Sequence, residues 1–303
     1  MRRETMRLAL FFVLLVSISA AAQLQVIRAG GLSAVGGAWI ALIMWTPGLA
    51  ALVTKLVFDR GLRGLGWGWG SSRLQLRAYL LPPAVAMVVY GGVWASGVVA
   101  VDAEGYGALI AKELGLGEAL SIPAAIALIA TVGFLANCLV VLGEEIGWRG
   151  YLFPELETRV GFTKASLATG AIWAVWHFPG IIWGGYNAGG PMLLSLVAFS
   201  IMLMSLSVIA GDLRSRTGSL WSGVVLHASH NLFIQGVFDP LTTRDHAARL
   251  LTTEWGVGLA IGYAAVAAWV LVRRRAAASS PQSANSCMRQ ALEGRDSGSH
   301  ASC

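Results

Sequence analysis

The residues best suited to chemistry in this sequence lie in three short stretches. The first, "EEIGWR", places Glu144, Glu145 and Arg149 directly after some twenty apolar residues. On a helix, Glu145 and Arg149 are four residues apart and share one face, whereas Glu144 points about 100° away. One carboxylate can therefore be neutralised by the arginine while the other stays free to act as a base. The alternative is a salt bridge at a helix end, with both glutamates reaching water.

The second and third stretches add imidazoles and an amide. His177 lies in the apolar run "AIWAVWHFPGIIW", one helical turn after Trp173. In "VVLHASHNLF", His227 and Asn231 are four residues apart and share a helix face, with His230 beside that face. Taken alone, each of these groups could simply hydrogen-bond to a neighbouring helix, because a polar side chain in a membrane must find partners.

Together the three stretches predict one shared cavity. A charge at the centre of a bilayer costs at least about 2.5 kcal/mol, so polar groups are retained there when they pair or carry function. A carboxylate, two imidazoles and an amide can activate a water molecule and stabilise an oxyanion. The same set could bind a divalent metal such as zinc through Glu144, His177 and His227, with a fourth position open for water. Spacing leaves both alternatives open.

The elements that must position these groups are membrane-spanning helices. Of the 303 residues, 56% are hydrophobic and only 13% are charged, about half the share of roughly 25% in soluble domains. A span needs about 20 apolar residues, and eight stretches qualify, at approximately 7–26, 33–57, 78–101, 121–143, 164–183, 191–210, 217–237 and 254–272. We therefore predict an all-α fold, a polytopic membrane helical bundle of about eight transmembrane helices, with the polar stretches on the fourth, fifth and seventh.

The distribution of basic residues predicts the orientation of this bundle. Sixteen Lys and Arg residues fall on one side of the eight-helix arrangement, and four fall on the other, namely Arg28, Lys112, Arg244 and Arg249. Because the side richer in Lys and Arg usually faces the cytoplasm, both termini are predicted to be cytoplasmic in a multi-pass protein of the cell membrane. The net charge of +6 is spread between apolar segments, which argues against a nucleic-acid partner.

Three regions follow from this organisation. Residues 1–120 hold the first three helices and an acidic external loop, residues 121–272 hold helices four to eight with the polar stretches, and residues 273–303 form a tail of small polar residues that is predicted to be disordered. Residues 1–22 have the basic start and apolar middle of a secretory signal peptide, which is the alternative to a retained first helix. The three cysteines are too scattered for a disulfide framework.

The three stretches resemble the motifs of the CAAX-processing and bacteriocin-processing (CPBP, Abi) intramembrane proteases. "EEIGWRGYL" is similar to their Glu-Glu-x-x-x-Arg motif, "WAVWH" to Phe-x-x-x-His with Trp173 in place of the Phe, and "HASHN" to His-x-x-x-Asn. The similarity covers about residues 120–237. It implies an intramembrane endopeptidase that hydrolyses a peptide bond of a membrane-associated or lipid-modified peptide, in CAAX-type or leader-peptide processing.

The resemblance also implies catalytic roles for four residues. Glu144 would activate the attacking water with the help of His177, and His227 and Asn231 would stabilise the oxyanion of the tetrahedral intermediate. The family has been described both as metal-dependent and as using a glutamate-activated water, so zinc enters as one alternative for a cofactor. The partners implied are membrane lipid and a peptide or protein substrate at the membrane.

Three further residues receive supporting roles from the resemblance. Arg149, paired with Glu145, would hold the first motif in shape, and Trp173 would take the place of the motif's Phe. His230 lies outside the motifs and receives no role. Because Glu144 lies near the predicted cytoplasmic end of its helix, we expect the cavity to open toward that side.

Two other classes of function remain in competition with a protease. A non-catalytic membrane scaffold or immunity protein would keep this fold without hydrolysing a substrate. A proton-coupled transporter would use Glu144 and the histidines as a proton relay. Such transporters commonly contain inverted repeats with charged groups in both halves, and neither feature is visible in this sequence.

Overall fold

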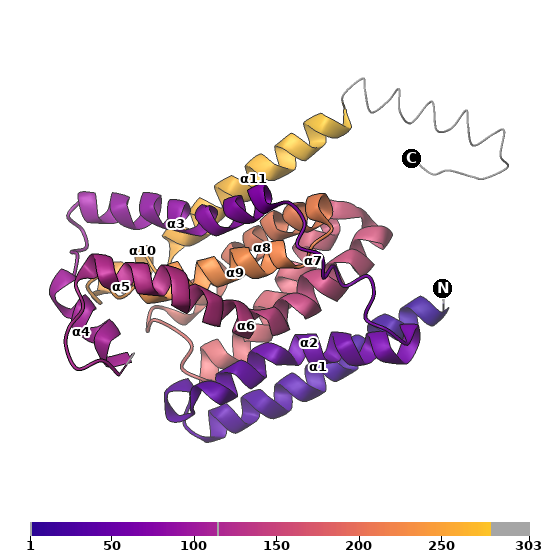
Figure 1. Cartoon of the computed structure of the whole chain (residues 1–303), viewed down its shortest axis with the longest axis horizontal. Coiled ribbons are helices and arrows are strands. Elements are labelled where there is room, and N and C mark those ends of the chain that lie inside the picture. Colours follow the sequence, from indigo (N-terminus) through magenta and orange to yellow (C-terminus); the bar gives the residue numbers. More distant parts are fainter. Residues whose placement is uncertain (1, 114, 280–303) are drawn as a thin grey trace.

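The chain folds into a bundle of helices in the computed structural model, which describes residues 2–113 and 115–279 (Figure 1). The long helices are α1 (Arg2–Arg28), α2 (Gly37–Asp59), α3 (Ser72–Ala95), α7 (Phe153–Trp183), α8 (Met192–Thr217) and α11 (Val257–Ala278). The shorter helices are α4 (Ala103–Glu113), α5 (Ile122–Leu128), α6 (Phe134–Glu145), α9 (Trp221–Phe233) and α10 (His246–Leu251). No β-strand occurs among the described residues, so the prediction of an all-α membrane bundle is confirmed.

The number of membrane spans is not confirmed as eight. In the part of the chain that the structure describes, six helices are long and apolar enough to cross a membrane: Arg3–Arg28, Gly37–Asp59, Ser72–Ala95, Ile122–Trp183, Met192–Thr217 and Val257–Ala277. The 62-residue run Ile122–Trp183 contains both the fourth and the fifth expected spans, and it bends between them at Gly161, whose φ of 75° is not helical. The seventh expected span corresponds to α9, which has 13 residues and then loosens into a π-helical turn, Ile234–Phe238.

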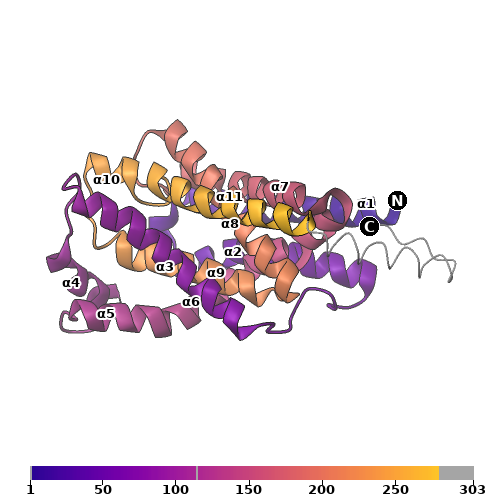
Figure 2. The same cartoon turned by 90° about the horizontal axis from the view of Figure 1, so that it is seen from above.

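One end of the bundle gathers charged side chains from helices that are far apart in the sequence. Arg7 at the start of α1 lies 3.0 Å from Asp59 at the end of α2 and 2.8 Å from Glu155 at the start of α7. Near the end of α8, the buried Asp212 lies 2.7 Å from Arg273 and 2.8 Å from Arg274, both on α11. We call the end of the bundle that holds these two charged clusters the basic end. Figures 1 and 2 show that α4 and α10 lie at the opposite end of the bundle.

Close packing between α2 and the end of α6 fixes the position of the two glutamates. A Cβ atom at Gly143 would lie 2.5 Å from the Cα of Trp45, and one at Gly48 would lie 2.5 Å from the carbonyl oxygen of Gly143. Only glycine allows these two backbones to approach so closely, as small residues do between membrane helices generally. The chain then continues as a π-helical turn, Ile146–Leu152, directly after the second glutamate.

The boundaries at the two ends of the bundle differ in detail from the sequence prediction. The loop predicted at 101–120 contains the helix α4. Helix α11 continues to Ala278, past the predicted boundary at 272. The rest of the predicted disordered tail, residues 280–303, lies outside the described residues.

Candidate functional site

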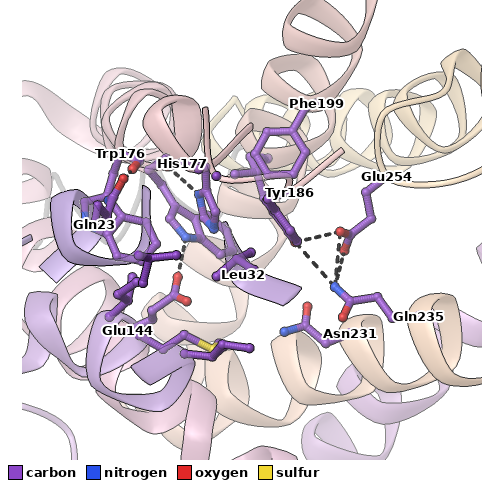
Figure 3. Close-up of a pocket in the computed structure, with 18 of the residues that line it drawn as sticks. Gln23, Leu32, Glu144, Trp176, His177, Tyr186, Phe199, Asn231, Gln235 and Glu254 are labelled. Carbon is purple, nitrogen blue, oxygen red and sulfur yellow. Dashed lines mark hydrogen bonds between the residues drawn. The ribbon is translucent and has the colours of Figure 1, made fainter. Parts of the chain in front are cut away.

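A cavity inside the bundle brings the three polar stretches together. It offers about 150 Å³ of space for water-sized groups. Helices α1, α2, α6, α7, α8 and α9 and the segment between α10 and α11 contribute to its wall, which includes Gln23, Met44, Glu144, Trp173, His177, Tyr186, His227, His230, Asn231, Gln235 and Glu254. All four residues proposed from the sequence for catalysis therefore line one space. Figure 3 labels three of them, Glu144, His177 and Asn231.

Glu144 lies at the deep end of the cavity with a side chain that is only 1% exposed. Its Oε2 accepts hydrogen bonds from the indole nitrogens of Trp173 at 2.6 Å and Trp148 at 3.3 Å. Both donors are neutral, so the carboxylate is held in place without being neutralised by a direct ion pair. This arrangement leaves the second oxygen available to a ligand in the cavity.

Glu145 takes a different environment one residue later. Its Oε1 lies 2.9 Å from Nη1 of Arg149 and 3.0 Å from Nδ1 of His227. All three side chains are buried. Helix α9 can approach this carboxylate because Gly223 has no side chain: a Cβ there would lie 2.3 Å from Oε2 of Glu145. Because a carboxylate accepts, Nδ1 of His227 carries the proton of this hydrogen bond and donates it to Glu145. The other ring nitrogen, Nε2, is left facing the cavity.

Trp173 connects these two carboxylates. Its indole N–H donates to Glu144, while the guanidinium carbon of Arg149 lies 4.3 Å from the centre of its ring system. A cation over an indole face is attracted by the electrons of the ring. The tryptophan therefore separates the arginine from Glu144 and still binds both, which a phenylalanine without an N–H group could not do.

His177 is fixed from several sides. Its Nδ1 lies 2.9 Å from the carbonyl oxygen of Trp173, so the ring donates there and presents Nε2 as an acceptor. The rings of Trp176, Phe199 and Tyr186 surround the imidazole at centroid distances of 4.6, 5.1 and 5.9 Å. Asn231, half-buried on α9, points into the same cavity (Figure 3).

The opposite wall holds a second polar group that sequence reasoning missed. Glu254, 2% exposed, accepts hydrogen bonds from Tyr186 at 2.7 Å, from His230 at 2.9 Å and from Gln235 at 3.1 Å. Burial would raise the pKa of Glu254, but these hydrogen bonds, led by that from His230, hold the pKa below its ordinary value. His230, which received no role from the sequence, thus belongs to this group; Nδ1 of its ring lies 2.8 Å from the hydroxyl of Tyr263.

The cavity does not extend toward the basic end, and the expectation that it opens there is wrong. Its two exposed lining residues are Ile40, near the start of α2, and Gln235, beyond α9. Asp59, at the basic end, lies 19 residues further along α2, or about 28 Å at 1.5 Å per residue. On the basic side of Glu144, the π-helical turn fills the interior with fully buried side chains such as Trp148 and Leu152.

If the basic end faces the cytoplasm, this opening faces the other side of the membrane, and labelling can check it. In a protein whose three native cysteines are replaced by serine, we expect Gln235→Cys to react with a membrane-impermeant maleimide in intact cells. Arg60→Cys, exposed at the basic end, is the matched control and should react only after permeabilisation. The reverse pattern would place the opening on the cytoplasmic side.

A divalent metal at Glu144, His177 and His227 stays a prediction from the sequence. Among the described residues, no three His, Cys, Asp or Glu side chains gather closely enough to hold a metal ion.

The fold and the cavity define a multi-pass membrane protein with an enclosed polar site. Comparison with known families then gives a match: residues 125–233 match the type II CAAX prenyl endopeptidase Rce1-like family. The match covers about a third of the chain and contains all three polar stretches. The resemblance to CAAX-processing proteases that the motifs indicated is thereby confirmed for this region.

A short segment also resembles an individual protein. It is 53% identical over 36 residues to CAAX prenyl protease 2 of Methanococcus maripaludis. The segment makes up 12% of this chain and 13% of that protein. The similarity is thus strong but local, and the chain matches only about an eighth of the length of this relative.

Proposed function

We propose that this protein is an intramembrane endopeptidase of the CPBP type, which hydrolyses a peptide bond with a water molecule activated in its central cavity. The observation that carries the proposal is that Glu144, His177, His227 and Asn231 line one space although they come from three separate helices. The family matched by residues 125–233 is one of endopeptidases, which favours hydrolysis over transport as the use of these groups.

The proposed reaction begins at Glu144. Its carboxylate takes a proton from a water molecule, whose oxygen forms a bond to the carbonyl carbon of the substrate. Nε2 of His177, an acceptor in the tautomer described above, helps to hold this water. When the tetrahedral intermediate collapses, the C–N bond breaks and the proton is delivered to the leaving amine, so that one water is consumed and the products are a carboxylic acid and an amine.

His227 and Asn231 would stabilise the negative oxygen of the intermediate. The amide of Asn231 can donate directly. His227 donates its Nδ1 proton to Glu145, so Nε2 can donate to the oxyanion only when the imidazole is protonated. Glu145, 3.0 Å from Nδ1, keeps the ring turned so that Nε2 faces the cavity. Glu145 and Arg149 are therefore assigned to holding His227 in place, and they do not contact the substrate.

The substrate we propose is a membrane-associated or lipid-modified peptide. Between the exposed Ile40 and the deep carboxylate, the wall includes the apolar side chains of Ile43 and Met44 on α2. An apolar entrance suits a peptide that arrives from the bilayer, as a prenylated cysteine peptide or a membrane-tethered leader would. The relative from Methanococcus maripaludis is named a CAAX prenyl protease, which supports the first of these substrates.

Reconstituted protein can test the proposal. Proteoliposomes should cleave members of a membrane-anchored peptide library, with products identified by mass spectrometry, and His177→Ala should reduce cleavage by about 10²-fold or more. A proton-coupled transporter would instead dissipate a pH gradient across the vesicles, and a scaffold or immunity protein would do neither. Equal cleavage by wild type and His177→Ala would contradict the assignment of His177.

A further inference from the structure

The wall of the cavity opposite Glu144 contains a hydrogen-bonded network whose function the proposed reaction leaves open. Its centre is Glu254, which lies between α10 and α11 and whose two oxygens accept from three side chains. The donors come from three different places in the fold: the loop after α7, helix α9 and the π-helical turn after α9 (Figure 3). Because Glu254 is hydrogen-bonded to side chains from three elements, it also helps to fix the groups that pack against those side chains.

The backbone beside Glu254 is held in an uncommon conformation. Thr253 has a φ of 66°, in the left-handed region that costs a residue with a side chain on the order of 1 kcal/mol or more. The backbone N–H of Thr253 donates to the hydroxyl of Tyr90 at 2.9 Å, which anchors the turn. The carboxylate of Glu254 is buried in the cavity wall directly after this anchored residue.

One donor of the network touches the proposed catalytic groups. The ring of Tyr186 stacks on the imidazole of His177 with an angle of 26° between the planes and 5.9 Å between centroids. Its hydroxyl donates to Glu254, so the tyrosine is held at both ends. A second donor, His230, is bound to Tyr263 on its other side and makes no comparable ring contact with His177.

We propose that Glu254 and Tyr186 are positioning residues: Glu254 fixes Tyr186, and the ring of Tyr186 fixes the plane of the His177 imidazole so that Nε2 faces the attacking water. The inference rests on the proposed function, because it assigns His177 a part in catalysis. Side-chain placement matters at this scale, since a displacement of 1 Å at a reacting group can cost about 10²-fold in rate.

A set of matched variants tests this proposal. Tyr186→Phe removes the donor and Glu254→Met removes the acceptor of this hydrogen bond, and we expect each to lower kcat about 10-fold while changing KM by less than about twofold. Because both act on one contact, the double variant should fall no further than the worse single variant. Tyr263→Phe, the control, removes a hydroxyl from the same network on the side away from His177, and should keep kcat within about twofold.

A second readout does not depend on cleavage. Diethylpyrocarbonate modifies exposed imidazole nitrogens, and mass spectrometry can follow the peptide that carries His177. We expect modification to be several-fold faster in Tyr186→Phe and Glu254→Met than in wild type or Tyr263→Phe, because the ring that covers the imidazole is released. Equal rates in all four proteins, or additive losses of kcat in the double variant, would overturn the positioning role. Absence of cleavage by wild type together with the expected modification pattern would instead refute the proposed function alone.

Discussion

Glu144→Gln should abolish peptide hydrolysis while leaving the protein folded. The amide has the shape of the carboxylate, and its oxygen can still accept the hydrogen bonds from Trp173 and Trp148, which lie 2.6 and 3.3 Å from Oε2. It cannot take a proton from water at neutral pH. Loss of a general base typically costs about 10² to 10⁴ in rate, so we expect kcat to fall about 10³-fold with little change in thermal stability.

Glu155→Gln is a suitable control for this substitution. Glu155 lies at the basic end, where it pairs with Arg7 and Arg159, and exposed or partly exposed ion pairs contribute only about 0 to 1 kcal/mol to stability. The control should therefore retain cleavage. Product formation is measured with purified protein in vesicles, and the melting temperature is measured on the same samples. Undiminished hydrolysis by Glu144→Gln would remove this residue from the reaction.

The convergence of the three polar stretches could be predicted because each interrupts an apolar helix. Glu144, His177 and His227 each lie in or at the end of an apolar stretch, so burial against one another was the simplest expectation, and the cavity lining contains all three. The pairing of Glu145 with Arg149 follows from a separation of four residues. These features depend on helical periodicity alone, which a single sequence displays.

The features that were not predicted depend on departures from regular helix. Glu254 lies in "TTEWG", where an acidic residue before an apolar stretch indicates a membrane interface, yet it is buried in the cavity wall next to the left-handed backbone of Thr253. The π-helical turn Ile146–Leu152 and its buried aromatic residues close the cavity on the basic side. Periodicity does not reveal either irregularity, so the second polar group and the direction of the opening both require the three-dimensional structure.

Variants of the buried pair Glu145–Arg149 should show that stability and activity can be lost and regained independently. Arg149→Met leaves the fully buried carboxylate with His227 as its remaining partner, and breaking a buried pair in this way typically costs about 3–5 kcal/mol. We expect a large fall in melting temperature for this variant. Adding Glu145→Gln removes the uncompensated charge, and neutral replacements of buried pairs are often tolerated, so the double variant should regain most of the lost stability.

Hydrolysis should not return with that stability. In the double variant His227 faces an amide in place of the carboxylate 3.0 Å from its Nδ1, and it loses the charge-assisted hydrogen bond that holds its ring toward the developing oxyanion. We therefore expect kcat to remain at least about 10²-fold below wild type in a protein that melts near the wild-type temperature. Recovery of both properties would show that the pair acts only as structural support, whereas recovery of neither would show that the Glu145 charge is needed for folding itself.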